Sequence, residues 1–260
     1  MDETKEELIF ARQIEELAKS AYYKTIACYS DFLNLNEQSI FHRMKKELPP
    51  VAYSLYGGCD DAERRILCFH GDYDGSGELN GSDFKEAYPI ACLEISPSNS
   101  RFAESLSHRD YLGAILNLGI DRSKTGDILI SGDIAYLYCD PFIADFIAEQ
   151  LDRIRHTTVK VSHRQTGQEI ERNYEMIHAN VPSLRLDAVI GAAFHSSRSS
   201  MTGLIPGGKV FVNGREILQG SYQIKPGEIV SVRGYGKFRF EEQGTLTKKG
   251  RINITIRKYT

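Results

Sequence analysis

One short stretch near the end of the sequence mixes basic and aromatic residues in a way that suits contact with a nucleic acid. Residues 233–240 read RGYGKFRF. Arginine and lysine side chains meet phosphates, and tyrosine or phenylalanine rings stack on unpaired bases. The side chains that could carry this chemistry belong to Arg233, Tyr235, Lys237 and Arg239.

The opening of this stretch, basic-Gly-aromatic-Gly, resembles the RNP1 signature of RNA-recognition motifs. In such a motif a helix and a fourth strand still follow RNP1, and residues 241–260 are too few for both with their connections. We therefore do not assign an RNP1 strand. The alternative is a twisted edge strand whose charges are solvated.

A second stretch, residues 72–83, has the spacing of a calcium-binding EF-hand loop. Its sequence DYDGSGELNGSD places oxygen-bearing side chains at loop positions 1, 3, 5, 9 and 12, with Gly77 at the sharp turn. An EF-hand needs a helix on each side, but residues 66–69 read as a strand. Asp83 also stands where a longer Glu usually reaches the ion with both oxygens. The flanks favour a polar surface loop, with a calcium site as the alternative.

Signatures of enzymes and metal centres are scarce in this sequence. It holds no phosphate-binding P-loop, no dinucleotide-binding glycine motif and no serine nucleophile elbow. His163, His178 and His195 lack the spacing of metal ligands. We expect no catalytic residue, no metal and no cofactor.

Composition and hydropathy indicate a globular protein of the cytoplasm. The chain has 260 residues, of which 41% are hydrophobic and 26% charged, which suits a buried core and excludes a disordered tail. No apolar run approaches the ~20 residues of a membrane span, and the acidic first residues are unlike a signal peptide. The five cysteines are odd in number and lack C-x-x-C spacing, so we expect reduced thiols, a cytoplasmic location and no membrane contact.

Hydrophobic periodicity predicts an α+β chain of three regions, at residues 1–60, 61–180 and 181–260. The first is expected to be a helical N-terminal region, with helices at 5–29 and 36–47. Pro49 and Pro50 end the second helix.

The central region is expected to fold as an RRM-like domain, with the order β-α-β-β-α-β from Ile90 onwards. This order is the split βαβ arrangement that RNA-recognition motifs share with many other proteins. Ser107 and Asp110 form a weak capping box at the first helix, and Asp140 caps the second.

In the last region, Ser183 is expected to cap a short helix, residues 184–194. The dipeptide Asn213-Gly214 predicts a tight turn after a strand at 209–212. Further strands are expected at 229–232 and 252–256.

The formal net charge of −3 hides a strong asymmetry along the chain. Residues 181–260 hold 13 Lys and Arg against 5 Asp and Glu, a balance of +8, whereas residues 1–180 hold 19 against 30, a balance of −11. Such a split indicates a basic module for a polyanion attached to an acidic body.

The basic module resembles the S4 RNA-binding domain, also called the alpha-L motif. The matching pieces follow the expected order, RLD at 185–187, SRS at 197–199, GKVFVNG at 208–214 and KPGEIVSV at 225–232. Glu228 stands where Asp often follows the glycine of the last piece.

A second short helical turn is expected after Ser197. Arg185 near the start of the first helix and Arg198 at the start of this turn can converge on one RNA backbone, and donors around the Asn213-Gly214 turn can reach phosphates. Asp187 is expected to orient a neighbouring arginine, because RNA repels a carboxylate. The candidate RNA-binding residues are Arg185, Arg198, Ser199, Lys209, Asn213, Arg215, Lys225, Arg233, Tyr235, Lys237 and Arg239.

Three further segments look like the YlmH family of bacterial proteins, which is related to a photosystem II S4 protein of plants and cyanobacteria. They are GGCDDAER at 57–64, HRDYLGAILNLGI at 108–120 and GDI at 126–128. The resemblance implies a helical N-terminal region, a central RRM-like domain and a C-terminal S4 domain. It also implies binding of rRNA and tRNA on the large ribosomal subunit, in ribosome-associated quality control of stalled nascent chains. Genes of this family often lie at a cell-division locus.

We therefore expect a monomeric, non-enzymatic RNA-binding factor. The main alternative is an RNA-modifying enzyme, such as a pseudouridine synthase, that the S4 domain targets to its substrate. Such synthases usually carry the module before a larger catalytic domain, whereas here it comes last. A third possibility is a calcium-responsive protein that uses residues 72–83.

Overall fold

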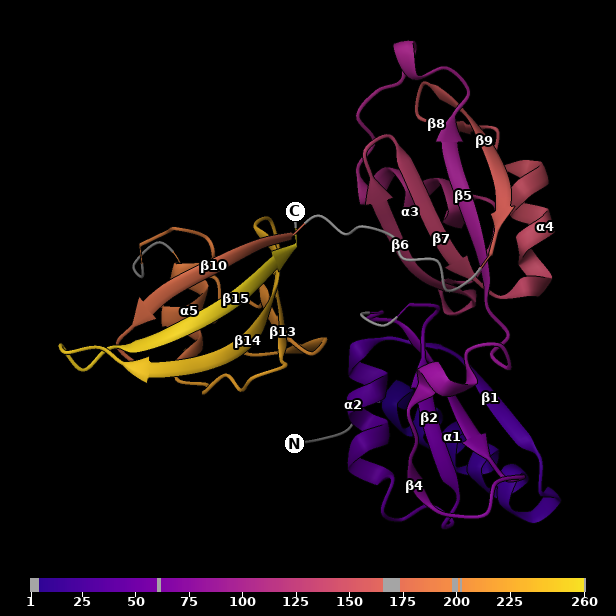
Figure 1. Ribbon diagram of the computed structural model, residues 1–260, viewed down its shortest axis with the longest axis horizontal. Coiled ribbons are helices and arrows are strands. Elements are labelled where there is room, and N and C mark those ends of the chain that lie inside the picture. Colours follow the sequence, from indigo (N-terminus) through magenta and orange to yellow (C-terminus); the bar gives the residue numbers. More distant parts are fainter. Residues whose placement is uncertain (1–4, 60–61, 166–173, 198–200, 202, 260) are drawn as a thin grey trace. The chain divides into compact units, whose positions relative to one another are not determined.

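Two compact units make up the chain, residues 1–172 and residues 173–260 (Figure 1). The computed structural model describes residues 5–59, 62–165, 174–197, 201 and 203–259. Each unit combines helices with a β-sheet, so the predicted α+β class is confirmed. No helix of the described part is long and apolar enough to cross a membrane.

The first part of unit 1 is a four-stranded sheet, here called the N-terminal sheet, with two helices against one face. The helices are α1 (Lys5–Lys24) and α2 (Leu35–Met44). The strands, in the order β1-β3-β2-β4, are Ala27–Leu33, Arg65–His70, Ala52–Tyr56 and Gly77–Glu78. A 3-10 helix, Gly81–Phe84, follows β4.

The prediction of a helical N-terminal region is incomplete. Both predicted helices exist, but β1 lies between them, and β2 and β3 complete a sheet that extends past residue 60. Four of the five residues of β2 are buried, on both faces of the sheet. A strand buried on both faces does not alternate between apolar and polar residues, so its period is hidden in the sequence.

The second part of unit 1 has the split βαβ topology that the sequence predicts. Its sheet, here called the central sheet, has the order β6-β7-β5-β9-β8. Its elements along the chain are β5 (Ala91–Pro97), a 3-10 helix (Ser100–Phe102), α3 (His108–Asn117), a 3-10 helix (Arg122–Lys124), β6 (Thr125–Ser131), β7 (Ile134–Cys139), α4 (Pro141–Gln150), β8 (Arg153–Ile154) and β9 (Thr157–Arg164).

The predicted caps of α3 and α4 are present. The carboxylate of Asp110 accepts from the backbone N–H of Ser107 at 2.8 Å. The carboxylate of Asp140 accepts from the backbone N–H of Phe142 at 3.0 Å, and a proline occupies the first turn of α4. These bonds satisfy amides that a helix leaves unpaired at its start.

A buried cluster joins the two sheets of unit 1. It contains Phe32 and Tyr56 from the N-terminal sheet and Tyr136 and Tyr138 from the central sheet. The helices cover the opposite face of each sheet, so the two faces without helices bury each other. Burial of this apolar surface makes the two parts one unit.

Two glycines permit this close approach. Gly58 has a φ of +95°, and a Cβ on it would lie 2.3 Å from the ring of Tyr138. A Cβ on Gly126 would lie 2.7 Å from the ring of Phe32. Both glycines belong to segments that carry the YlmH resemblance, so part of that pattern reflects packing between the sheets.

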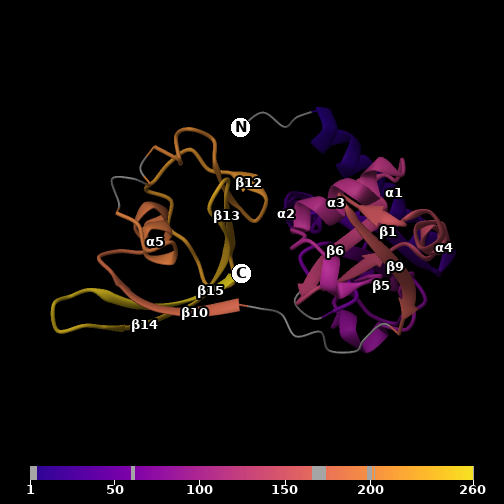
Figure 2. The same cartoon turned by 90° about the horizontal axis from the view of Figure 1, so that it is seen from above.

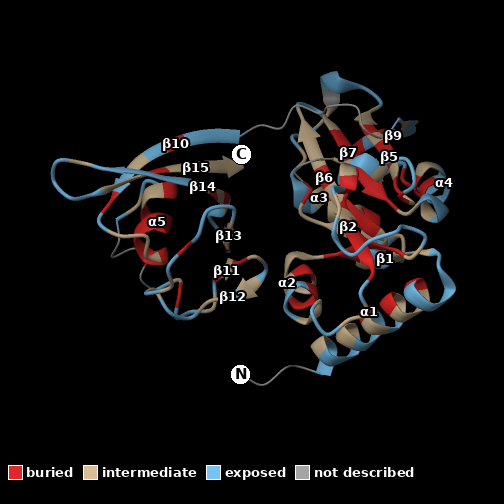
Figure 3. Ribbon diagram, turned by 60° about the horizontal axis from the view of Figure 1, so that its bottom comes forward, coloured by how far each residue is buried: buried red, intermediate tan, exposed pale blue. Residues whose placement is uncertain are grey.

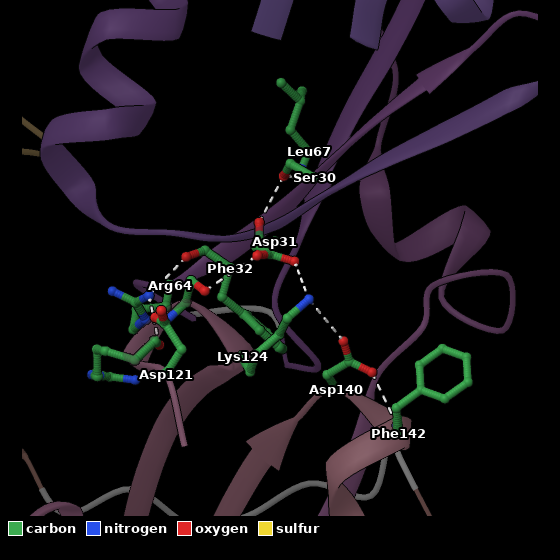
Figure 4. A network of polar contacts seen from close by, with 11 residues as sticks. Ser30, Asp31, Phe32, Arg64, Leu67, Asp121, Lys124, Asp140 and Phe142 are labelled. Atoms are coloured by element: carbon green, nitrogen blue, oxygen red, sulfur yellow. Dashed lines mark hydrogen bonds and ion pairs between the residues drawn. The ribbon is translucent and has the colours of Figure 1, made fainter. Parts of the chain in front are cut away.

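Arg64 crosses the boundary between the two parts (Figure 4). Its guanidinium donates to the carbonyl of Phe32 at 2.7 Å on one side, and to the carbonyls of Thr125 at 2.8 Å and Arg122 at 3.1 Å on the other. Burial lowers the pKa of Arg64. Three carbonyl partners offset the cost of burying that charge.

Asp127 and Lys124 add charged contacts to the same boundary. Asp127 accepts from the backbone N–H groups of Glu63 and Arg64 at 2.8 and 3.1 Å. The Lys124 ammonium lies between two carboxylates, 2.7 Å from Asp31 and 3.4 Å from Asp140 (Figure 4). Asp127 is therefore a structural residue that holds the segment before β3.

Unit 2 is a six-stranded sheet, here called the C-terminal sheet, with the helix α5 (Leu186–Ala193) against one face. The helix is labelled in Figure 2, and Figure 3 shows that it is almost entirely buried. The strands, in the order β10-β15-β14-β13-β11-β12, are Tyr174–Val181, Ile252–Tyr259, Gly236–Leu246, Ile229–Val232, Val210–Val212 and Arg215–Glu216.

Two details of unit 2 differ from the sequence prediction. The unit begins before residue 181, because β10 pairs along its whole length with β15. The helix begins later than predicted, with Arg185 rather than Ser183 at its N-cap position. The backbone N–H of Leu186 bonds to the carbonyl of Tyr222 at 2.8 Å, so a distant loop replaces the side-chain cap.

Replacing Gly58 by alanine is expected to lower the free energy of unfolding of unit 1 by about 3 kcal/mol or more, from backbone strain and overpacking together. Chemical denaturation followed by circular dichroism measures it. Gly113→Ala is the matched control, because a Cβ there meets nothing within 4 Å. This helical position should gain about 0.5–1 kcal/mol. Equal free energies of unfolding for Gly58→Ala and Gly113→Ala would contradict the close approach of Gly58 to the Tyr138 ring.

A buried polar network lies on the N-terminal sheet. His70 Nε2 lies 2.6 Å from the hydroxyl of Ser54, which lies 2.6 Å from the hydroxyl of Tyr88. All three side chains are buried. Burial lowers the pKa of His70, so its imidazole is neutral in the folded protein.

This lowered pKa makes stability depend on pH. The unfolded chain binds a proton on His70 at higher pH than the folded chain does, so the free energy of unfolding falls as the pH drops below about 6.5. His70→Gln should reduce this slope in denaturation series between pH 7 and pH 5. His156→Gln removes an exposed histidine and should leave the slope nearly unchanged. The same slope in both variants would disprove the role of His70.

Candidate nucleic-acid interface

Arg185 lies at the start of α5 and is held by Asp187. Its guanidinium donates to the two carboxylate oxygens of Asp187 at 2.9 and 3.3 Å. The side chain of Asp187 is 7% exposed and that of Arg185 is 39% exposed. A buried carboxylate thus fixes the direction of a cation that solvent can reach, as the sequence suggested.

The loop that leads to Lys225 lies against the start of the same helix. Ile224 donates from its backbone N–H to the carbonyl of Leu184 at 3.0 Å, and Arg185 forms an isolated β-bridge with Gln223. The exposed side chain of Lys225 therefore belongs to a segment directly beside Arg185.

Glu228 shapes this loop. Its carboxylate accepts from the backbone N–H of Lys225 at 2.8 Å and from the hydroxyl of Tyr222 at 2.6 Å. The longer side chain, which departs from the usual S4 pattern, is therefore used within the loop.

The predicted Asn213-Gly214 turn joins β11 to β12. Asn213 and Gly214 have φ values of +48° and +75°. The side-chain oxygen of Asn213 accepts from the backbone N–H of Ile229 at 2.9 Å. Asn213 is thus a structural residue first, and Arg215 begins the short strand that follows the turn.

Lys209 and Arg233 lie together at the other end of β11. The backbone N–H of Arg233 donates to the carbonyl of Lys209 at 2.9 Å, and both side chains are exposed. The Arg233 guanidinium lies 4.8 Å from the centre of the Phe211 ring. This pair can present two cations to one anion.

The RGYGKFRF stretch is neither an RNP1 strand nor an edge strand. Its second half lies in β14, an interior strand between β13 and β15. Phe238 and Phe240 are buried against α5, so Lys237 and Arg239 point to the opposite face of the sheet. Tyr235 instead lies beside Phe194, with ring centres 5.8 Å apart.

The structure therefore divides the predicted site residues. Arg185 and Lys225 lie at the start of α5, and Asn213 and Arg215 lie at the turn. Lys209 and Arg233 lie at the other end of β11, whereas Lys237 and Arg239 lie on the face of the sheet opposite α5. Arg198 and Ser199 are outside the described residues.

Sequence reasoning missed Arg257, Tyr174 and Tyr259. They lie on the same face as Lys237 and Arg239, on the strands β15 and β10. A signal existed in the alternation of apolar and polar residues along 252–257, INITIR, which predicts a strand with one polar face.

The tyrosine rings of β7 in the central sheet are buried and cannot serve as the stacking surface of an RNA-recognition motif. Such motifs stack bases on exposed aromatic rings of the central strands. Here Tyr136 and Tyr138 of β7 are 8% and 1% exposed, because the N-terminal sheet covers them. Arg164 lies 4.5 Å from the ring centre of Tyr136.

The EF-hand-like stretch at 72–83 has a strand, β3, before it, and its last three residues lie in the 3-10 helix Gly81–Phe84. Asn80 caps that 3-10 helix by accepting from the backbone N–H of Ser82 at 3.4 Å. Within the described residues, no group of three or more His, Cys, Asp or Glu side chains is arranged to hold a metal ion. β3 and this 3-10 helix thus stand where an EF-hand has its two flanking helices.

Unit 2, with its cations around α5 and the 213–214 turn, defines an RNA-binding protein of the S4-domain class. The S4 domain family matches residues 184–230, and the family described as "Putative RNA-binding domain in YlmH" matches residues 84–168. The chain is 30% identical over 234 residues to "Ribosome-associated protein quality control protein P2" of Bacillus subtilis (strain 168). The match covers 88% of this chain and 86% of that protein. The chain belongs to the YlmH family.

A solved structure described as "Cell division protein ylmH from Streptococcus pneumoniae" also matches. It is 22% identical in sequence and has a TM-score of 0.48. The match covers 64% of this chain and 94% of that chain.

Asn213→Ala is expected to lower the free energy of unfolding of unit 2 by about 2 kcal/mol. The variant loses the hydrogen bond from the Ile229 N–H, and it places alanine at a positive φ, which strains the backbone. Asn213→Gly loses only the hydrogen bond and should cost about 1 kcal/mol. Denaturant titration followed by circular dichroism measures both. Gln219→Ala, at an exposed position of the same unit, is the control. Equal values for the alanine and glycine variants would refute the strain at this turn.

Proposed function

We propose that this protein binds RNA on the ribosome and acts in ribosome-associated quality control of stalled nascent chains. The observation that carries the proposal is the S4-type unit, in which a buried carboxylate orients Arg185 beside exposed Lys225. The Bacillus subtilis relative, whose name places it in this process, is similar over 88% of this chain.

The finer proposal is that the contacts are to rRNA and tRNA on the large ribosomal subunit. The protein would act there as a cytoplasmic monomer and without a catalytic step of its own. The charge division supports a docking role, since residues 1–180 carry −11 and residues 181–260 carry +8. The acidic part repels RNA and confines binding to the basic unit.

Binding would combine a fixed cation with mobile ones. Arg185 cannot swing freely, because two bonds hold it to Asp187. Lys209 and Lys225 extend from loops on exposed side chains and can adjust to phosphates. If about six phosphates are met, the slope of log K against log salt is roughly −4 for a single strand and steeper for a duplex.

Lys209→Glu combined with Lys225→Glu tests the RNA-binding face. The double variant should bind purified large ribosomal subunits at least about tenfold more weakly, with a shallower salt dependence, because two phosphate contacts become repulsive. Lys160→Glu is the control, since it makes a charge change at an exposed position of unit 1. Co-sedimentation with subunits at several salt concentrations provides the measurement.

Undiminished binding of the double variant would reject this face as the ribosome contact. The role in quality control has a separate readout in cells. Removing the protein should change the extension of nascent chains on a stalled reporter, and the wild-type chain should restore it. An unchanged reporter would reject that role while leaving the ribosome binding intact.

A further inference from the structure

The C-terminal sheet has a second face that α5 does not cover, here called the outer face. It is formed by alternate residues of β10, β15 and β14, whose neighbours in sequence are buried against α5. Across these three strands it carries the following side chains: Tyr174, Met176, His178, Thr255, Arg257, Tyr259, Lys237 and Arg239, with the carboxylates of Glu241 and Glu242 beside Arg257 and Thr255.

Cations and aromatic rings on the outer face are already paired. The Arg257 guanidinium lies 5.0 Å from the centre of the Tyr174 ring, and the Lys237 ammonium lies 5.3 Å from the centre of the Tyr259 ring. Tyr174 is 50% exposed and Met176 is 43% exposed.

The charges on the outer face are also unusual for a sheet. Arg239 and Arg257 are direct cross-strand partners, and two like charges in this position destabilise a sheet. Glu241, at the border beyond a bulge, lies 2.8 Å from Arg257 and 4.0 Å from Arg239. Glu241 thus lies beside both guanidinium groups, so the two arginines form one charged cluster on this face.

We propose that the outer face binds an unpaired RNA segment, with bases stacked on Tyr174 and Tyr259 and phosphates near Arg239 and Arg257. The exposed Tyr174 ring and the partly buried Tyr259 ring lie beside cationic side chains, and single-stranded nucleic acids bind to such combinations of rings and cations. A base-paired helix hides its base faces and cannot use these rings. Unit 2 as a whole supplies the attraction, with 13 Lys and Arg against 6 Asp and Glu in residues 173–260.

This inference rests on the proposed RNA-binding function and extends it to a second surface. The outer face is opposite α5 on the same sheet, whereas Arg185 and Lys225 lie at the start of α5. A structured RNA on the α5 side and an unpaired segment on the outer face can therefore bind at the same time.

The test uses the full chain and a fluorescent ten-nucleotide oligouridylate, with an RNA duplex of equal length for comparison. Arg239→Gln with Arg257→Gln should weaken oligouridylate binding at least about tenfold and reduce the salt slope by about 1.4, from two lost phosphate contacts. Lys248→Gln with Lys249→Gln removes the same charge from the exposed β14–β15 hairpin and should have a much smaller effect. Equal losses in the two double variants would overturn the proposal, because they would show attraction by net charge alone.

A second pair of variants isolates stacking from charge. Tyr174→Leu keeps apolar surface but removes the ring, and should weaken oligouridylate binding about fivefold or more. Tyr174→Phe keeps the ring and should bind like the wild type. Ultraviolet crosslinking to the oligouridylate should label Tyr174 or Tyr259. Crosslinks confined to the α5 side, or equal binding by the leucine variant, would overturn the proposal.

Failure of this inference differs from failure of the proposed function. If the outer-face variants bind normally while the Lys209 and Lys225 double variant loses the ribosomal subunit, only the outer face is rejected. If neither set of variants weakens any RNA complex, RNA binding by unit 2 is rejected as a whole. Thermal melting of every variant must show an intact fold, and Tyr174→Phe provides that reference.

Discussion

A β-sheet has two faces, and in this protein helices cover only one face of each sheet, so the other face must be buried or solvated. In unit 1 the uncovered faces of the N-terminal and central sheets meet and bury Tyr136 and Tyr138. In unit 2 the uncovered face is instead made of cations and tyrosines. The central sheet has the topology of RNA-recognition motifs, but this constraint leaves its Tyr136 and Tyr138 rings buried.

The contact between the sheets of unit 1 depends on short backbone approaches and on a buried arginine. Arg64 satisfies carbonyl groups on both sides, and Asp127 satisfies two backbone N–H groups of the segment before β3. Such bonds add little net stability when formed, but their loss leaves buried groups unpaired. The segments that resemble the YlmH family are therefore explained in part by packing.

In unit 2, hydrogen bonds of buried polar groups also fix the direction of an exposed side chain. Asp187 is buried and its partner Arg185 is exposed, so the burial of one charge fixes the direction of the other. Glu228 and Asn213 likewise use their side chains to shape the backbone around Lys225 and the turn. These polar side chains thus fix the backbone and the side-chain directions around the exposed Lys225 and the turn.

The sequence by itself determined the split βαβ order, the caps at Ser107 and Asp140, the Asn213-Gly214 turn and the basic module, because these depend on local periodicity, local hydrogen bonds and charge. Tertiary structure alone decided that β2 is a strand, since a strand buried on both faces has no alternating pattern. It also decided that Lys237 and Arg239 lie away from Arg185, because the face on which a strand residue lies depends on register with strands far away in sequence.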